Sequence, residues 1–132
     1  MTKIIILITG FFFFTSCSDA QTKNGMESSE AGVINKVVAA KDFQAKLGDE
    51  NIQLIDVRTP AEYSAGKIGD ASNVDFYADD FKAQLEKLDK TKPTLIYCAS
   101  GGRSGNAASM MKDLGFQEVY DLQGGYKGWP FK

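Results

Sequence analysis

Two nearly continuous apolar runs constrain the fold of this chain more than any other feature of its sequence. Residues 52–57 and 94–98 are mainly apolar, as expected of strands that are buried on both faces of a parallel sheet. Residues 118–122 form a third candidate strand, and residues 37–38 and 73–76 form shorter, weaker ones. The runs therefore predict a sheet that is covered on both sides.

Helical patterns lie between these runs. Residues 40–47 place two apolar side chains four residues apart, and residues 79–88 carry an apolar stripe opposite charged residues. Residues 104–114 carry a similar stripe and end at a glycine, a common stop signal for a helix. The alternation of strands and helices predicts a single α/β domain with a mainly parallel central sheet flanked by helices.

The N-terminus is typical of a targeting signal. Lys3 precedes an apolar run over residues 4–14 that is too short to span a bilayer comfortably. The run ends in Phe-Thr-Ser-Cys, which resembles the bacterial lipoprotein signal. This resemblance implies that the chain is cut before Cys17 and that lipid is attached to the Cys17 sulfur. An ordinary signal peptide and an uncleaved anchor are the alternatives.

A polar stretch separates this signal from the predicted domain. Residues 18–32 contain no periodic apolar face and predict a flexible linker. We therefore divide the chain into a lipoprotein signal peptide (1–17), a linker (18–32) and the α/β domain (33–132). Several acyl chains give a stable anchor, so we expect an exported, membrane-anchored lipoprotein that faces the periplasm.

The absence of one residue type limits the chemistry. The chain has no histidine and only two cysteines, Cys17 and Cys98. Ser-His-Asp triads, Cys-His dyads, imidazole metal sites and cysteine zinc sites are therefore excluded. A nucleophile in this chain must be activated by main-chain dipoles or cationic side chains. The net charge of -2 at pH 7 gives no reason to expect a nucleic-acid partner.

A glycine-rich segment joins the apolar run at 94–98 to the last helical pattern. Cys98 ends the run, and Gly101, Gly102 and Arg103 follow. Ligands of α/β sheets bind at the carboxyl ends of strands. Adjacent glycines permit a tight turn whose N–H groups converge on one point, and the next helix adds its positive end. The segment therefore predicts a stabilised thiolate or persulfide anion at Cys98, beside the fixed positive charge of Arg103.

Three segments together resemble the rhodanese-like domain family. Residues 98–103, with Leu-Ile-Tyr before them, look like a rhodanese active-site loop. Residues 54–63 resemble the Asp-Val-Arg segment after the family's second strand, and residues 122–129 resemble its closing Gly-Gly…Trp segment. Residues 66–74 depart from the family pattern because the usual histidine, proline and one glycine are missing. Tyrosine phosphatases use a longer loop, whereas only four residues separate Cys98 from Arg103, and this smaller ring fits sulfur better than phosphate.

The resemblance implies a site built on the loop. We expect Cys98 to be the catalytic thiol. The predicted substrate-binding residues are Ala99, Ser100, Gly101, Gly102 and Arg103, and the predicted supporting residues are Asp56, Arg58 and Ser104.

For residues outside the loop, the sequence mainly predicts structural roles. Arg58 is expected to pair with Glu62 four residues later, and Asp56 to brace the loop. Tyr126 and Trp129 are expected to be packing residues at the C-terminal closure.

The function implied by the resemblance is that of a sulfurtransferase. Such an enzyme moves sulfane sulfur from thiosulfate or a persulfide donor to a thiol or cyanide through a persulfide on Cys98. No metal or organic cofactor is implied, and we expect a monomer without a nucleic-acid partner. The alternative is a non-enzymatic rhodanese-like module that senses redox state or binds a partner.

Overall fold

The central sheet has five strands, and their order in space differs from their order along the chain. The computed structural model describes residues 34–132. The strands are β1 (Ile34–Val38), β2 (Gln53–Asp56), β3 (Ser72–Asn73), β4 (Thr94–Tyr97) and β5 (Glu118–Leu122). They pair in the order β1-β5-β4-β2-β3, and every pairing is parallel. The prediction of a single α/β domain with a mainly parallel sheet is therefore confirmed.

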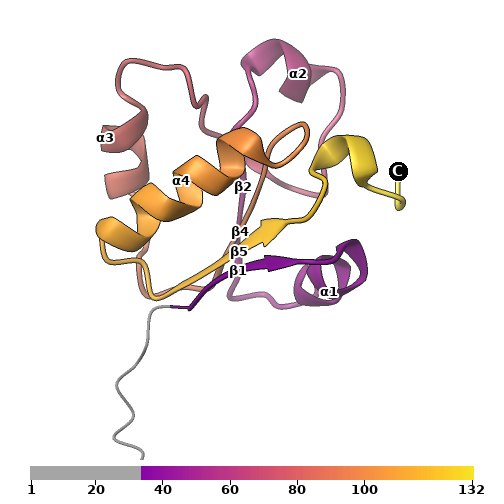
Figure 1. Cartoon of the computed structure of the whole chain (residues 1–132), viewed down its shortest axis with the longest axis horizontal. Coiled ribbons are helices and arrows are strands. Elements are labelled where there is room, and N and C mark those ends of the chain that lie inside the picture. The colour runs from indigo at the N-terminus through magenta and orange to yellow at the C-terminus, as the bar shows by residue number, and fades with distance from the viewer. Residues whose placement is uncertain (1–33) are drawn as a thin grey trace, which may run out of the picture.

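Helices cover both faces of this sheet. They are α1 (Ala40–Lys46), α2 (Pro60–Ser64), α3 (Phe81–Glu86) and α4 (Gly102–Asp113), followed by the short 3-10 helix η1 (Tyr126–Gly128). Figure 1 shows α4 on one side of β5 and β1 and α1 on the opposite side, next to β1. Within residues 34–132, no helix has the length and apolar character needed to cross a membrane.

The two faces of the sheet carry separate cores. On one face, Leu85 of α3 and Met111 of α4 are fully buried against Ile96 and Val119 of the sheet. The other face joins α1 to the C-terminal segment, where Phe43 makes an edge contact with the ring of Trp129. Because both faces of the sheet are buried, the central strands carry apolar residues on both sides.

Period-two alternation along β4 decides where the thiol points. Leu95 and Tyr97 belong to the core beneath α1, whereas Ile96 and Cys98 belong to the core beneath α4. The Cys98 side chain therefore faces α4, whose first turn follows it along the chain.

The predicted elements are present, with differences at their ends. The strand expected over residues 73–76 is β3, which contains only two residues, and the run at 37–38 belongs to the longer β1. Helix α4 begins two residues earlier than predicted, because Gly101 adopts the left-handed conformation that starts it. Helix α2 was not predicted, since its five residues are too few to show an apolar stripe. The predictions for residues 1–32, including lipidation at Cys17, lie outside the described residues.

Removal of the Tyr97 hydroxyl group tests how much a buried polar contact contributes to the stability of this fold. Tyr97 is fully buried, and its hydroxyl accepts a hydrogen bond of 3.0 Å from the buried Ile68 amide. Tyr97→Phe is expected to lower the free energy of unfolding by about 1–3 kcal/mol, because the amide loses its acceptor. Urea unfolding measures the difference. The control is Tyr77→Phe on an exposed ring, which should change stability by less than about 0.5 kcal/mol. Equal stability of Tyr97→Phe and the wild type would contradict the prediction.

Candidate active site

The Cys98 sulfur lies inside the turn that joins β4 to α4. Cys98 is only 1% exposed. The Gly101 amide donates a hydrogen bond of 3.0 Å to the Cys98 Sγ atom, and the Ser104 hydroxyl lies 3.4 Å from the same atom. The turn requires a glycine at position 101, where φ is 109°. The start of α4 and the residue before it therefore place two hydrogen-bond donors against the sulfur.

The loop makes the Cys98 thiol more acidic than an ordinary cysteine. Burial is the largest single influence and raises the pKa of the thiol. The hydroxyl and amide of Ser104 and the amides of Ser100 and Gly101 oppose it, and together they lower the pKa below its usual value. A low thiol pKa increases the fraction of nucleophilic thiolate at neutral pH.

The segment after β5 supports this loop from behind. The Tyr126 amide donates to the Cys98 carbonyl at 2.8 Å, and the Lys127 amide donates to the Ala99 carbonyl at 2.9 Å. Gly125 has a φ of 60°, and a Cβ atom there would lie 2.6 Å from backbone atoms of residues 98, 99 and 100. Only glycine fits this close approach.

Arg103 closes the loop through an ion pair with α2. Its guanidinium makes two contacts of 2.8 Å with the two oxygens of Glu62. The Arg103 hydrogen bonds are the main reason that the pKa of Glu62 falls to about 2. Glu62 also completes a capping box with Thr59 at the start of α2. The pair thus joins the start of α4 to the start of α2.

The predicted ion pair between Arg58 and Glu62 is wrong. Arg58 instead pairs with Asp56, since its Nε atom lies 2.9 and 3.0 Å from the two carboxylate oxygens. The two residues are 3% and 0% exposed. Arg58 precedes Thr59, the N-cap of α2, so the helical four-residue spacing does not bring it to Glu62.

Asp56 and Arg58 reach the loop only through other residues. The Arg58 guanidinium lies 4.1 Å from the ring centre of Tyr126, whose amide binds the Cys98 carbonyl. Arg58 also donates to the Gly66 carbonyl at 2.6 Å, and so holds the turn that departs from the rhodanese pattern. The Asp56–Arg58 pair is therefore a buried structural unit behind the loop.

The structure brings most of the predicted site residues together. Cys98, Ala99, Ser100, Gly101, Gly102, Arg103 and Ser104 form one continuous turn and the start of α4, whereas Asp56 and Arg58 lie at the end of β2. Their roles in catalysis stay predictions. Cys17, the predicted lipidation site, lies outside the described residues.

Sequence reasoning missed two residues that shape the site. Glu62 was assigned to the wrong arginine, although Thr59 and Glu62 have the spacing of a capping box. Gly125 was noted only as part of a family segment, and nothing in its local sequence shows that it touches the loop.

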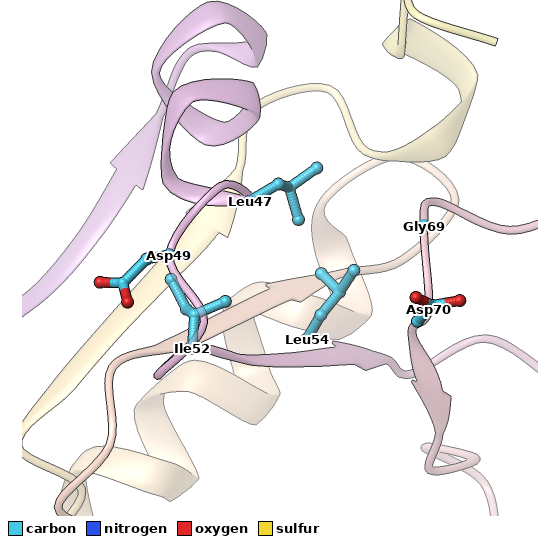
Figure 2. A pocket seen from close by; sticks show the side chains of 6 residues that line it. All are labelled: Leu47, Asp49, Ile52, Leu54, Gly69 and Asp70. Carbon is cyan, nitrogen blue, oxygen red and sulfur yellow. The ribbon is translucent and has the colours of Figure 1, made fainter.

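A hollow elsewhere on the domain does not involve the thiol. It measures about 280 Å³ and is lined by Leu47, Asp49, Ile52, Leu54, Gly69 and Asp70. Figure 2 shows the leucine and isoleucine side chains on one side of it and Gly69 and Asp70 on the other. Leu47, Ile52 and Leu54 pack against the core beneath α1, whereas Cys98 belongs to the core on the opposite face. The hollow is therefore separate from the candidate active site.

The fold and the loop define a class of α/β proteins that hold a cysteine in a turn of hydrogen-bond donors at the end of a parallel strand. The family model described as Rhodanese-like domain matches residues 39–131, and the chain belongs to this family.

Relatives agree with this assignment. The chain is 30% identical over 97 residues to a protein named Sulfurtransferase from Allochromatium vinosum, covering 74% of this chain and 89% of that protein. It is 35% identical over 84 residues to Thiosulfate sulfurtransferase GlpE of Pseudomonas entomophila, covering 63% and 74%. The crystal structure of a rhodanese-related protein from Thermoplasma volcanium superposes with a TM-score of 0.63 at 26% identity, covering 71% of this chain and 89% of that one.

Gly125→Ala tests the support behind the loop. The added methyl group would meet three backbone atoms at 2.6 Å, so the loop must move and its amides must leave the Cys98 sulfur. We expect the thiol pKa to rise toward its ordinary value. Alkylation of Cys98 by iodoacetamide, measured against pH, should then have a midpoint about one pH unit higher, which is a tenfold loss of thiolate below that midpoint.

Gly128→Ala is the matched control, because a Cβ atom at Gly128 meets nothing within 4 Å. Its alkylation profile should match that of the wild type. A wild-type midpoint in a folded Gly125→Ala protein would show that the close approach does not govern the thiol.

Proposed function

We propose that this chain is a sulfurtransferase that carries sulfane sulfur as a persulfide on Cys98. The observation that supports this most directly is the ring of donors around the sulfur, with the Gly101 amide 3.0 Å from Sγ. A ring of this kind stabilises an anion on sulfur without a histidine or a metal. Membership of the rhodanese-like family and similarity to proteins named sulfurtransferases support the same chemistry.

The first half-reaction forms the persulfide. The Cys98 thiolate attacks the outer sulfur of thiosulfate, and a bond forms between the two sulfur atoms. The bond between the outer sulfur and the sulfite group breaks, and sulfite leaves with the bonding electron pair. In this proposal the loop donors, which lower the pKa of the Cys98 thiol, also hold the terminal persulfide sulfur as an anion.

The second half-reaction regenerates the thiolate. An acceptor such as cyanide attacks the terminal sulfur and forms thiocyanate, while the bond to Cys98 breaks and its electron pair stays on Sγ. With a thiol acceptor the product is a new persulfide. The exchange has no net oxidation, so it needs no further cofactor.

Arg103 is the cationic group best placed to attract an anionic donor. Its guanidinium is partly exposed, with 17% of the side-chain surface accessible. Glu62 neutralises part of its charge, so a donor would bind beside the ion pair or displace Glu62 from it.

The cellular location of the enzyme is part of the same proposal. The sequence of residues 1–17 supports a lipoprotein signal with Cys17 as the lipidated residue. The domain would then act as a monomer on the periplasmic side of a membrane, with a small sulfur donor and a thiol or cyanide acceptor as its partners.

Intact-mass analysis of the domain tests the persulfide. Treatment with thiosulfate should add the mass of one sulfur atom to the wild type, and cyanide should remove it, because the loop stabilises the terminal sulfur. Cys98→Ser is the control and should gain nothing. A wild type that gains no sulfur from thiosulfate or from several persulfides would favour the binding or redox-sensing module instead.

Arg103→Ala tests the anion-binding role. The KM for thiosulfate should rise about tenfold or more, since a charge-assisted hydrogen bond contributes about 1.5–3 kcal/mol. The KM for a neutral organic trisulfide should change much less. Steady-state thiocyanate formation measures both, with Lys112→Ala, a change in an exposed cation of the same helix, as the control. Unchanged kinetics with thiosulfate would remove Arg103 from the site.

A further inference from the structure

A carboxylate neutralises the cation beside the candidate active site. Arg103 is the only cationic side chain among residues 98–105, which form the loop and the first turn of α4. Its two terminal nitrogen atoms each donate a hydrogen bond of 2.8 Å to a different oxygen of Glu62. The pair has no net charge, so Arg103 attracts an anion less strongly than a free guanidinium would.

Glu62 is also held in this position by a residue other than Arg103. The amide and the hydroxyl of Thr59 donate hydrogen bonds of 3.0 and 2.9 Å to Glu62 Oε2. The hydrogen bonds from Arg103 are the main reason that the pKa of Glu62 falls to about 2, so Glu62 is charged at every physiological pH. A ligand that displaced Glu62 from Arg103 would therefore still have a negative charge beside it. Each negative charge on the ligand adds to this repulsion.

An exposed aromatic ring lies beside the same guanidinium. The centre of the Tyr77 ring is 5.6 Å from Arg103 Cζ, and Tyr77 is one of three large apolar side chains that stay exposed in residues 34–132. The Tyr77 amide donates a hydrogen bond of 3.0 Å to Asp75 Oδ1, and its ring makes an edge contact with Phe76. A tyrosine ring that is held in this way offers contact area to an organic group at a low cost in conformational entropy.

The thiol, the ion pair and the ring belong to one site. Cys98 and Arg103 lie in the same turn. Hydrogen bonds with Glu62 are the main cause of the raised pKa of Arg103, and Cys98 adds to it, as does Tyr77, so both lie within electrostatic range of the guanidinium. The segment that carries Tyr77 supplies no positive charge, since residues 75–80 contain three aspartates and neither lysine nor arginine. A donor whose outer sulfur meets Cys98 therefore extends toward a neutralised cation and an exposed ring.

Within the proposed sulfurtransferase function, and resting on it, we propose that Glu62 and Tyr77 determine donor specificity. They favour a sulfane donor that has one negative charge and an organic group over thiosulfate, which has two negative charges and no organic group. Glu62 repels the second charge, and Tyr77 packs against the organic group.

Organic thiosulfonates, R–SO2–S⁻, are donors of this class, because R replaces one charged oxygen of thiosulfate. The Cys98 thiolate attacks the outer sulfur, and a bond forms between the two sulfur atoms. The bond between the outer sulfur and the sulfonyl sulfur breaks, and the sulfinate R–SO2⁻ leaves with the bonding electron pair. The persulfide on Cys98 is the same as the one that thiosulfate gives, so the donors differ only in the charge and shape of the leaving group.

Three donors separate the effect of charge from that of the ring. They are thiosulfate, methanethiosulfonate and benzenethiosulfonate, with thiocyanate formation from cyanide as the measurement. Glu62→Gln removes the repelling charge, so kcat/KM for thiosulfate should rise about fivefold, equivalent to the roughly 1 kcal/mol of a partly exposed ion pair. For methanethiosulfonate the rise should be only about twofold, because Coulomb repulsion is proportional to the charge of the donor.

Tyr77→Ala tests the ring. It should lower kcat/KM for benzenethiosulfonate about fivefold, since a pair of aromatic rings contributes about 1 kcal/mol. The two donors without a ring should change by less than about twofold. Phe131→Ala is the matched control, because it removes another exposed ring, one that contacts Trp129 in the core on the opposite face of the sheet. It should leave all three donors unchanged.

Two further variants control for Glu62→Gln. Glu86→Gln makes the same chemical change at an exposed carboxylate that ends α3, and it should keep the donor preference of the wild type. Circular dichroism checks that each variant is folded. If Glu62→Gln is not folded, Glu62→Asp decides the question, because it keeps a carboxylate near Thr59 but withdraws it from Arg103, and thiosulfate should again gain more than methanethiosulfonate.

The outcome separates this inference from the proposed function. No gain in Glu62→Gln, or equal gains for thiosulfate and methanethiosulfonate, would overturn selection by charge. Unchanged use of benzenethiosulfonate in Tyr77→Ala would overturn the role of the ring. A wild type that accepts sulfur from all three donors, with variants that keep its preference, would leave the sulfurtransferase proposal intact. Failure of every donor to place sulfur on Cys98 would overturn both.

Discussion

The loop around Cys98 depends on contact with the main chain that follows β5. Two amides of that segment bind the carbonyls of Cys98 and Ala99, and Gly125 approaches the loop so closely that a single added carbon atom would displace it. With its carbonyls bound on the outer side, the loop can turn its own amides toward the sulfur. The acidity of the thiol therefore depends on backbone packing between two segments that are far apart in the sequence.

Two ion pairs extend this support beyond the loop. The Asp56–Arg58 pair is buried, and removing one partner of such a pair generally costs about 3–5 kcal/mol because a charge is left uncompensated. The guanidinium of this pair lies over the ring of Tyr126, next to the residue that touches the loop. The second pair, Arg103 with Glu62, is more exposed and uses a carboxylate that also caps α2. One pair is thus structural, and the other lies where a ligand could compete for it.

The sequence was most informative where neighbouring residues act together. The apolar runs at 52–57 and 94–98 predicted central strands because burial on both faces removes polar residues from them. The loop from Cys98 to Arg103 was found because its donors adjoin the thiol along the chain. Gly125 could not be placed in the same way, since its contact with the loop depends on which strands pair. The predicted ion pair between Arg58 and Glu62 was wrong because helical spacing does not apply to Arg58, which precedes the helix.

The strand order has a consequence for how the domain is assembled. β1, the first described strand, lies at the edge of the sheet and pairs with β5, the last one. A ribosome that synthesises the chain from its N-terminus therefore releases β1 long before its partner exists. Contacts of such long sequence separation slow folding, because the loop between them must close first. The first strand waits unpaired, and the segment that completes the sheet also completes the support of the thiol loop.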